Sequence, residues 1–438
     1  MAVVRLDLTS RRLADEICPY EELRGEAEFA VDPYHALNRV ITDLELAPGD
    51  PSGKVHFTAD VRILRPLEPA RGNRGIFLDV VNRGRSVFER TLDRDFLLQR
   101  RFTVVTCGWQ HDVSRGGGLF GMSAPVTGAG FMALRDLVAC LRNDGHEFAI
   151  ALGGSQSGRL LRHLVYLGMC EAETGGLAID GVLPVAAGPR MTEANLRDGE
   201  PSSNGPRSSM FPATDAEVLQ RARARGALPK LVHINTSSEY WSSAADVHVS
   251  AALCHAAAGR DIESPENVRM YLCASTQHAP APLDGPVDGR GIYPPNTIDY
   301  KPFVRAAVDN LTEWVTRDVA PPPSVYPRFD DGTLTSELRP VRDVDGNELG
   351  GLRHPDVSVP LGTYTGWNPS AEDPRVLVRA LGATIPFTTS AIATRYGSRA
   401  EFLARIREVA SELAAQRYVL EEDVDSLVCT SAWRWDHI

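Results

Sequence analysis

The chain has 438 residues, 43% of them hydrophobic and 24% charged, which is ordinary for a globular protein. Its formal net charge is −11 and no basic stripe stands out, so we expect no nucleic-acid partner. The N-terminus lacks the apolar segment of a signal peptide and no stretch reaches the ~18 apolar residues of a membrane span, which predicts a cytoplasmic protein with no membrane partner.

The N-terminal region has the alternation of a half-buried strand. If the chain is extended, five apolar side chains point the same way: Val55, Phe57, Ala59, Val61 and Ile63. Pro66 and Pro69 close this stretch. We therefore expect several antiparallel strands within residues 1–70 to open a sheet.

Short apolar runs then alternate with helical segments. The predicted strands are Gly75–Val81, Phe102–Cys107, Phe148–Leu152, Ile179–Val185, Leu231–Ile234 and Val268–Cys273. Helical spacing marks Phe131–Arg142 and Arg159–Cys170. This alternation predicts an α/β fold with a mostly parallel central sheet and helices on both faces, and function in the loops after the strand ends.

Two stretches depart from this pattern. Residues 188–230 are rich in Pro, Ser, Asn and Arg and too long for a simple connection, so we expect a lid insertion about there; a disordered surface loop is the alternative. A proline run begins after Ala320, and one amphipathic helix is predicted at Arg399–Ala415. We expect a core over residues 1–320 and, over 320–438, a helical C-terminal extension packed on that core.

Ser155 is the candidate nucleophile. It lies in Gly153-Gly154-Ser155-Gln156-Ser157-Gly158, between an apolar strand and a helix, which is the context of a nucleophile elbow. Ser157 rather than glycine stands two residues after Ser155, a departure from G-x-S-x-G that keeps a small side chain. A phosphate-binding turn at a helix N-terminus and a structural turn are the alternatives, although neither G-x-G-x-x-G nor the P-loop spacing is present.

A base and an acid should follow the nucleophile in the order Ser, acid, His. His278 lies in the loop directly after the last predicted core strand, the place of a general base. Glu239 lies just past the strand that ends near Ile234 and is the candidate acid, with Asp246 in reserve. A carboxylate that complements a helix N-terminus is the structural alternative for Glu239.

The remaining site residues follow from the chemistry of acyl transfer. A tetrahedral oxyanion needs two backbone N–H donors. We assign them to Gln156, the residue after the nucleophile, and to Arg83 in the Asn82-Arg83-Gly84 loop. The candidates for substrate contact are Asn82, Trp109, Tyr240 and Trp241, although core packing explains the aromatic residues equally well. The seven cysteines show no Cys-x-x-Cys pair, and we expect no metal and no cofactor.

Several strings resemble one family. They are DPYHALNRVITDLELAP (32–48), VVNRGR (80–85), GGSQSGRLLR (153–162), SSEYW (237–241), STQHAPA (275–281) and VPLGTYTGWN (359–368). They are similar to those of bacterial and fungal alpha/beta hydrolase domain-containing proteins, and the resemblance covers nearly the whole chain. It implies the α/β-hydrolase fold and, motif by motif, a triad of Ser155, Glu239 and His278.

The expected activity is a serine hydrolase that cleaves a carboxylic ester or lactone through an acyl-enzyme. The partner would be a small-molecule ester. Two alternatives stay open: an acyltransferase or thioesterase that acts on a natural-product intermediate, and a catalytically silent fold used for binding. The substrate and the oligomeric state do not follow from the sequence.

Overall fold

The computed structural model describes residues 2–13, 19–111, 113, 118–120, 126–199, 214–241, 251–257, 259–286, 288–378 and 380–437. The chain forms two compact units. The first comprises Met1–Leu231 with Trp314–Asp318, and the second comprises Val232–Glu313 with Val319–Ile438. The predicted division into a core over residues 1–320 and an extension over 320–438 stays a prediction.

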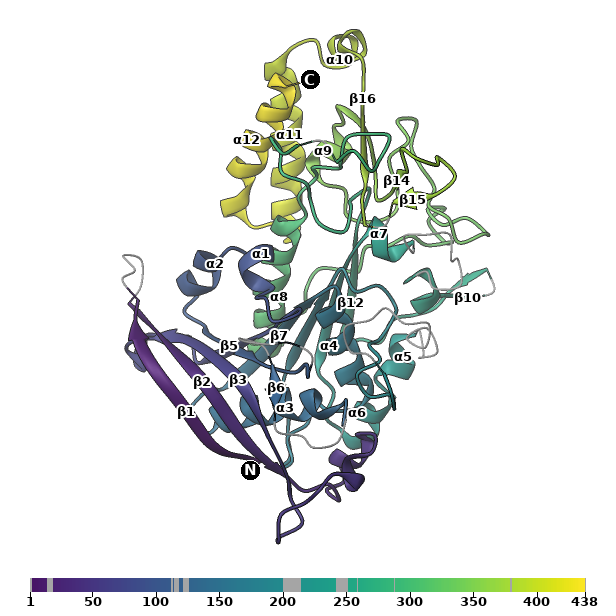
Figure 1. Ribbon diagram of the computed structural model, residues 1–438. Coiled ribbons are helices and arrows are strands. Elements are labelled where there is room, and N and C mark those ends of the chain that lie inside the picture. Colours follow the sequence, from purple (N-terminus) through teal and green to yellow (C-terminus); the bar gives the residue numbers. More distant parts are fainter. Residues whose placement is uncertain are drawn as a thin grey trace. The chain divides into compact units, whose positions relative to one another are not determined.

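The first unit opens with an antiparallel ladder of β1 (Val3–Arg12), β2 (Tyr20–Val31) and β3 (Val55–Pro66), drawn in purple in Figure 1. The five apolar residues of β3 that alternate from Val55 to Ile63 are all buried, as predicted. Because strand side chains point alternately to opposite faces, this pattern turns one face of β3 toward the core.

Parallel strands continue the sheet of the first unit. The order is β3, β5 (Thr103–Cys107), β4 (Gly75–Val80), β7 (Phe148–Gly154) and β8 (Gly181–Val185); β5 is antiparallel to β3 and the rest run parallel. Every residue of β4, β5 and β8 is buried, so both faces of these strands are covered. The predicted mostly parallel sheet with helices is confirmed.

Helices follow the strands of this sheet. They are α1 (Phe88–Thr91), α2 (Arg94–Gln99), α3 (Ala129–Arg142) and α4 (Gln156–Tyr166). Helix α4 begins three residues before the predicted start, directly after Ser155. It also ends four residues early, because Gly168 takes φ 74° and turns the chain out of the helix.

The segment expected as a lid is described only at its two ends. Residues 188–199 are mostly buried, and Arg162 of α4 pairs with Asp215 at 2.7 Å, both buried, in α5 (Asp215–Val218). Helix α6 (Gln220–Arg225) follows. Residues 200–213 lie outside the described part of the chain, so the lid stays a prediction.

The second unit contains most of β9 (Lys230–Thr236) and its neighbour β12 (Val268–Cys273). Helix α7 (Ser237–Tyr240) follows β9 without a linker, and α8 (Lys301–Arg317) follows the loop after β12. Strand β12 has the bounds that its apolar run predicts. Short elements complete the two units: β6 (Leu119–Phe120), β10 (Ala256–Ala257), β11 (Arg260–Asp261), and 3-10 turns at Asn38–Val40, Leu44–Leu46, Pro69–Arg71, Ala251–Cys254 and Glu421–Asp423.

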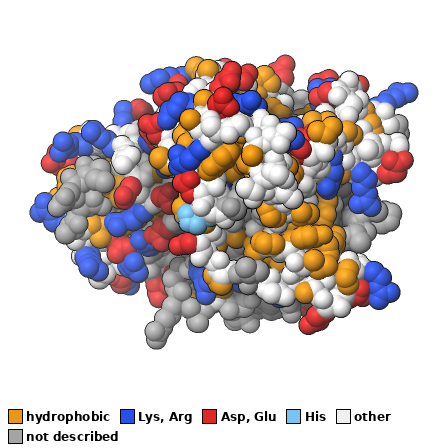
Figure 2. Space-filling view, turned by 90° about the horizontal axis from the view of Figure 1, so that it is seen from above, with side chains coloured by type: hydrophobic (Ala, Val, Ile, Leu, Met, Phe, Trp, Pro, Cys, Tyr) orange, Lys and Arg blue, Asp and Glu red, His pale blue; other side chains and the backbone are white. Residues whose placement is uncertain are grey.

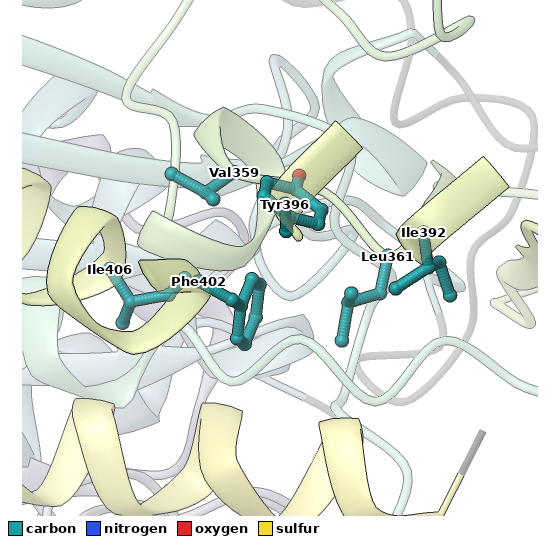
Figure 3. Close-up of a cluster of buried hydrophobic side chains, with 6 residues drawn as sticks. All are labelled: Val359, Leu361, Ile392, Tyr396, Phe402 and Ile406. Atoms are coloured by element: carbon teal, nitrogen blue, oxygen red, sulfur yellow. The ribbon is translucent and has the colours of Figure 1, made fainter. Parts of the chain in front are cut away.

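The C-terminal part of the second unit has its own hydrophobic cluster. Its elements are α9 (Pro355–Ser358), β13 (Gly362–Thr365), β14 (Asn368–Pro369), β15 (Leu377–Val378), β16 (Ala383–Pro386), α10 (Thr389–Tyr396), α11 (Arg399–Ala415) and α12 (Val424–Asp436). Figure 3 shows the buried cluster of Val359, Leu361, Ile392, Tyr396, Phe402 and Ile406. These side chains come from two helices, α10 and α11, and from the segment after α9, and they hold α11 at its predicted bounds.

Charged and apolar side chains share the surface. Acidic and basic groups are interspersed over the face drawn in Figure 2, where apolar side chains also gather in one area. Many of the charges pair with each other, for example Arg62 with Glu22 and Glu89. None of the helices in the described ranges is long and apolar enough to cross a membrane, and no group of His, Cys, Asp or Glu side chains in those ranges could hold a metal ion.

Candidate active site

The backbone at Ser155 has the strain expected of a nucleophile elbow. Ser155 has φ 54° and ψ −113°, between the last residue of β7 and the first residue of α4. A non-glycine residue rarely takes this conformation, and such strain gathers at functional sites. Hydrogen bonds hold the turn: Ser155 N donates to Val185 O at 2.8 Å, and Arg159 N donates to Ser155 O at 2.9 Å. The sharp strand-to-helix turn thus exists where the sequence predicts it.

Two glycines let β7 and α4 approach each other at this turn. A Cβ on Gly153 would lie 2.5 Å from Ser157 O, and one on Gly158 would lie 2.8 Å from Gly153 O. The close approach therefore falls on Gly158, not on Ser157. Ser157 is buried and its Oγ accepts a hydrogen bond from Gly154 N and donates one to Gly154 O. This explains how a serine replaces the second glycine of G-x-S-x-G.

The loop predicted to supply an oxyanion donor lies beside the elbow. Val80 at the end of β4 pairs in register with Gly153, and the Asn82 side chain donates from Nδ2 to Gly154 O at 3.1 Å. Asn82 and Arg85 exchange backbone hydrogen bonds around a two-residue turn. Arg83 has φ 50° within it, so the turn is the tight type that needs left-handed residues.

Side chains after β5 hold this loop. Trp109 Nε1 donates to Val81 O at 2.7 Å, and Arg83 N donates to Gln110 Oε1 at 3.0 Å. Trp109 is 1% exposed, so it packs in the core. Core packing was the alternative to substrate contact for this residue. The backbone N–H of Arg83, which the sequence analysis assigns to the oxyanion, therefore already donates to the Gln110 side chain. The sequence reasoning missed Gln110, whose side chain accepts from this donor.

A buried carboxylate lies under the same loop. Asp79 of β4 is fully buried, and its Oδ1 accepts hydrogen bonds from Val87 N at 3.0 Å and Phe88 N at 3.1 Å. Burial raises the pKa of Asp79 to about 6, against the hydrogen bonds of Ser86, Val87 and Phe88, which lower it. Asp79 therefore holds the start of α1, although its charged form is disfavoured because the carboxylate is removed from water.

The predicted acid and base meet in the second unit. Glu239 Oε1 is hydrogen-bonded to His278 Nδ1, and Thr236 Oγ1 donates to Glu239 Oε2. An ionised carboxylate only accepts hydrogen bonds, so Nδ1 carries the proton and the imidazole lone pair lies on Nε2. This is the tautomer that a general base requires. The reserve acid Asp246 lies outside the described residues.

The backbone of His278 is held from two sides. His278 N donates to Ser238 Oγ at 3.1 Å, and Tyr300 OH donates to His278 O at 2.8 Å. Ser238 Oγ in turn donates to Gly366 O. The side chain of His278 is 28% exposed and that of Glu239 is 12% exposed, so the imidazole is accessible while its partner is nearly covered.

Comparison with known proteins identifies the family of this chain. Over residues 121–429, more than half of the chain, the sequence matches the family described as alpha/beta hydrolase domain. The chain belongs to this alpha/beta hydrolase family. The predicted α/β-hydrolase fold is confirmed, and membership supports a hydrolytic enzyme. A search of curated proteins finds no match.

Solved structures similar to this alpha/beta hydrolase include an S-formylglutathione hydrolase from Staphylococcus aureus, with 11% identity, 48% of this chain and 80% of that chain covered, and a TM-score of 0.27. A sugar hydrolase from Lactococcus lactis has 12% identity, 60% and 94% coverage and a TM-score of 0.34. Brefeldin A esterase, a bacterial homologue of human hormone sensitive lipase, has 13% identity, 47% and 71% coverage and a TM-score of 0.26. Likeness at this level carries no argument about substrate.

The two aromatic residues after Glu239 are buried in this alpha/beta hydrolase. Tyr240 is fully buried and its hydroxyl is hydrogen-bonded to His255 Nε2. Trp241 is 7% exposed and packs edge-on against Tyr240, with ring centroids 4.7 Å apart. Burial raises the pKa of Tyr240 well above its usual value. Both residues have packing roles, and their contact with substrate stays a prediction, as does that of Asn82.

Proposed function

We propose that this alpha/beta hydrolase is a serine hydrolase that cleaves a carboxylic ester or lactone through an acyl-enzyme on Ser155. The observation that carries the proposal is the Glu239–His278 pair, in which a carboxylate fixes the basic tautomer of an imidazole in the loop after β12. The strained backbone of Ser155 also supports it.

The proposed reaction has two halves. In the first, His278 Nε2 takes the proton of Ser155 Oγ as that oxygen bonds to the carbonyl carbon, and the carbonyl π electrons move to the oxygen. The tetrahedral species collapses when the ester C–O bond breaks, and the leaving alkoxide takes the proton from His278. In the second half, a water repeats the sequence against the acyl-enzyme. It releases a carboxylic acid and returns the proton to Ser155.

Glu239 would orient the imidazole and stabilise its cation, without taking the proton itself. The oxyanion would bind the backbone N–H groups of Gln156 and Arg83. Because Arg83 N already donates to Gln110 Oε1, the oxyanion would replace that side-chain oxygen as the acceptor. A donor that is occupied by a weaker acceptor in the resting enzyme is available to a charged one, since hydrogen bonds to ions are stronger.

The test is covalent labelling with a fluorophosphonate, read as the intact mass of the full-length protein. Wild type should gain one adduct and Ser155→Ala none, with the same far-UV circular dichroism spectrum for both. An adduct on Ser155→Ala, or none on wild type, would contradict the assignment of Ser155. In the second case the silent binding fold becomes the better hypothesis.

A further inference from the structure

A buried carboxylate from the C-terminal part of the second unit contacts both the turn that carries the acid and the turn that carries the base. Glu348 is 1% exposed. Its Oε2 accepts a hydrogen bond from Ser237 Oγ at 2.6 Å and one from Ser275 N at 3.1 Å. Its backbone N donates to Ser275 Oγ at 2.9 Å. One residue therefore makes three hydrogen bonds to two segments that are distant in the sequence.

These two segments are the ones that hold the reactive pair. Ser237 is the first residue of α7, two residues before Glu239. Ser275 lies in the loop after β12, three residues before His278, and has a left-handed conformation with φ 60°. The Glu239–His278 bond joins side chains of two separate turns, so its geometry depends on how those turns are held against each other. Glu348 bonds to both of them.

A stability role alone does not account well for a carboxylate at this place. Burial raises the pKa of Glu348, whereas the Ser237 hydroxyl, the Ser275 N–H, Arg342 and Trp241 lower it. Burying a charge carries a large desolvation penalty that its partners only partly offset, and an apolar side chain of similar volume is often as stable or more so. A carboxylate, unlike an apolar side chain, accepts hydrogen bonds from both Ser237 Oγ and Ser275 N and so fixes the positions of these two donors.

A second clamp acts on the same two turns. Ser238 Oγ accepts from His278 N and donates to Gly366 O. Gly366 also approaches α7 closely, since a Cβ there would lie 2.6 Å from Ser238 N. Without Glu348, the hydrogen bond from His278 N to Ser238 Oγ and the Glu239–His278 bond still join the acid turn to the base turn. The unit should fold, with the reactive pair less well defined.

We infer that Glu348 is a positioning residue that aligns Glu239 with His278 by clamping Ser237 and Ser275. The inference rests on the proposed function. It predicts an effect on the chemical step rather than on substrate binding, because Glu348 is buried behind the turns. A misplacement of about 1 Å in a catalytic group costs roughly 10²-fold in rate.

The experiment measures kcat and KM of the full-length protein with p-nitrophenyl acetate at 25 °C. Glu348→Ala should lower kcat by roughly 10²-fold and change KM by no more than about threefold. Glu348→Gln keeps an oxygen that accepts from Ser237 and Ser275, and should restore kcat to within about fivefold to tenfold of wild type. Rescue by glutamine would show that the hydrogen-bonding side chain, rather than its charge, sustains kcat, since both variants remove the charge.

The matched control is Asp356→Asn. Asp356 is also a buried carboxylate of the C-terminal part, where it pairs with Arg434 and His354. This variant should lower Tm and leave kcat of the folded protein unchanged. The inference is overturned if folded Glu348→Ala keeps the wild-type kcat, or if Asp356→Asn loses as much kcat as Glu348→Ala.

Ser237→Ala serves if Glu348→Ala does not fold. It removes one of the three hydrogen bonds and should lower kcat by about tenfold with KM unchanged; an unchanged kcat overturns the inference. Failure of the proposed function looks different. Wild type would then show neither turnover nor a fluorophosphonate adduct, and the basis of the inference would be gone.

Discussion

Asp79→Asn should make the first unit more stable at neutral pH. Asp79 is fully buried in β4, and the oxygen that accepts from Val87 N and Phe88 N has an equivalent in asparagine. The asparagine amide takes the place of Oδ2. The substitution therefore keeps the shape and the two hydrogen bonds to Oδ1, and removes the charge.

The size of the effect follows from the raised pKa. The pKa of Asp79 is about 6 in the folded protein against an ordinary value of 3.8. The folded state then holds the proton of Asp79 more tightly than the unfolded state does. The contribution of this group to the free energy of unfolding therefore falls as pH rises from about 4 to about 6. At ~1.4 kcal/mol per pH unit, the folded state at pH 7.5 carries a penalty of about 3 kcal/mol, which falls to about 1 kcal/mol at pH 4.5.

The assay is thermal unfolding of wild type and Asp79→Asn at pH 7.5 and pH 4.5. The gain of about 3 kcal/mol corresponds to a rise in Tm of roughly 6–12 °C for a unit of this size, and the rise should shrink to about a third at pH 4.5. Asp144→Asn, at an exposed carboxylate, is the control and should change Tm little at either pH. A lower Tm for Asp79→Asn at pH 7.5, or an equal gain at both pH values, would refute the reasoning.

Three further substitutions test the elbow, the proposed base and the loop after β4. Gly153→Ala places a Cβ 2.5 Å from a backbone oxygen of α4 and should lower the free energy of unfolding by about 2–4 kcal/mol, measured by urea denaturation; a loss below about 1 kcal/mol would mean that the elbow relaxes easily. Gln277→Ala should keep more esterase activity than His278→Ala, since only the second removes the base, and equal losses would argue against His278 as that base. Asn82→Ala removes the hydrogen bond to Gly154 O and should slow fluorophosphonate labelling by about tenfold without a change in fold; an unchanged rate would show that this link does not position the nucleophile.

Elements with strong local signals have the bounds that the sequence predicts. Helix α11 spans Arg399–Ala415 because Ser398 caps it, with its hydroxyl accepting from Glu401 N, and because Phe402 and Ile406 bury one face. Strand β12 is a short apolar run that ends before a polar loop. In both cases the residues that set the boundary lie next to it in the chain.

Helix α4 shows why a local pattern can miss a boundary. Its apolar face begins at Leu160, which places the predicted start at Arg159. The strained turn at Ser155 nevertheless starts the helix at Gln156, two residues after the strand ends at Gly154. The elbow motif predicts the turn, but the periodicity of the side chains does not show how soon the helix follows it.

Most of the residues that hold the reactive groups have no signal in the sequence. Gln110 bonds to Arg83, 27 residues away, and Glu348 bonds to Ser237, 111 residues away. Such pairs depend on the tertiary fold, and a polar residue in a loop resembles any other until the fold brings its partner. One sequence feature could have pointed to Gln110: it follows the carboxyl end of a buried parallel strand, where functional residues gather.

The proposed oxyanion loop and the proposed base are held in the same way. The loop that carries the proposed oxyanion donor and the loop that carries His278 are each held by side chains from elsewhere, which bond to the backbone of the loop. Trp109 and Gln110 hold the loop after β4, whereas Ser238 and Tyr300 hold His278. Loss of one such bond costs about 1 kcal/mol of stability, which a folded domain tolerates, but a shifted nucleophile or base loses far more in rate. Substitutions of these four side chains should therefore give folded proteins with impaired catalysis. Enzyme activity should respond to such substitutions more strongly than protein stability does.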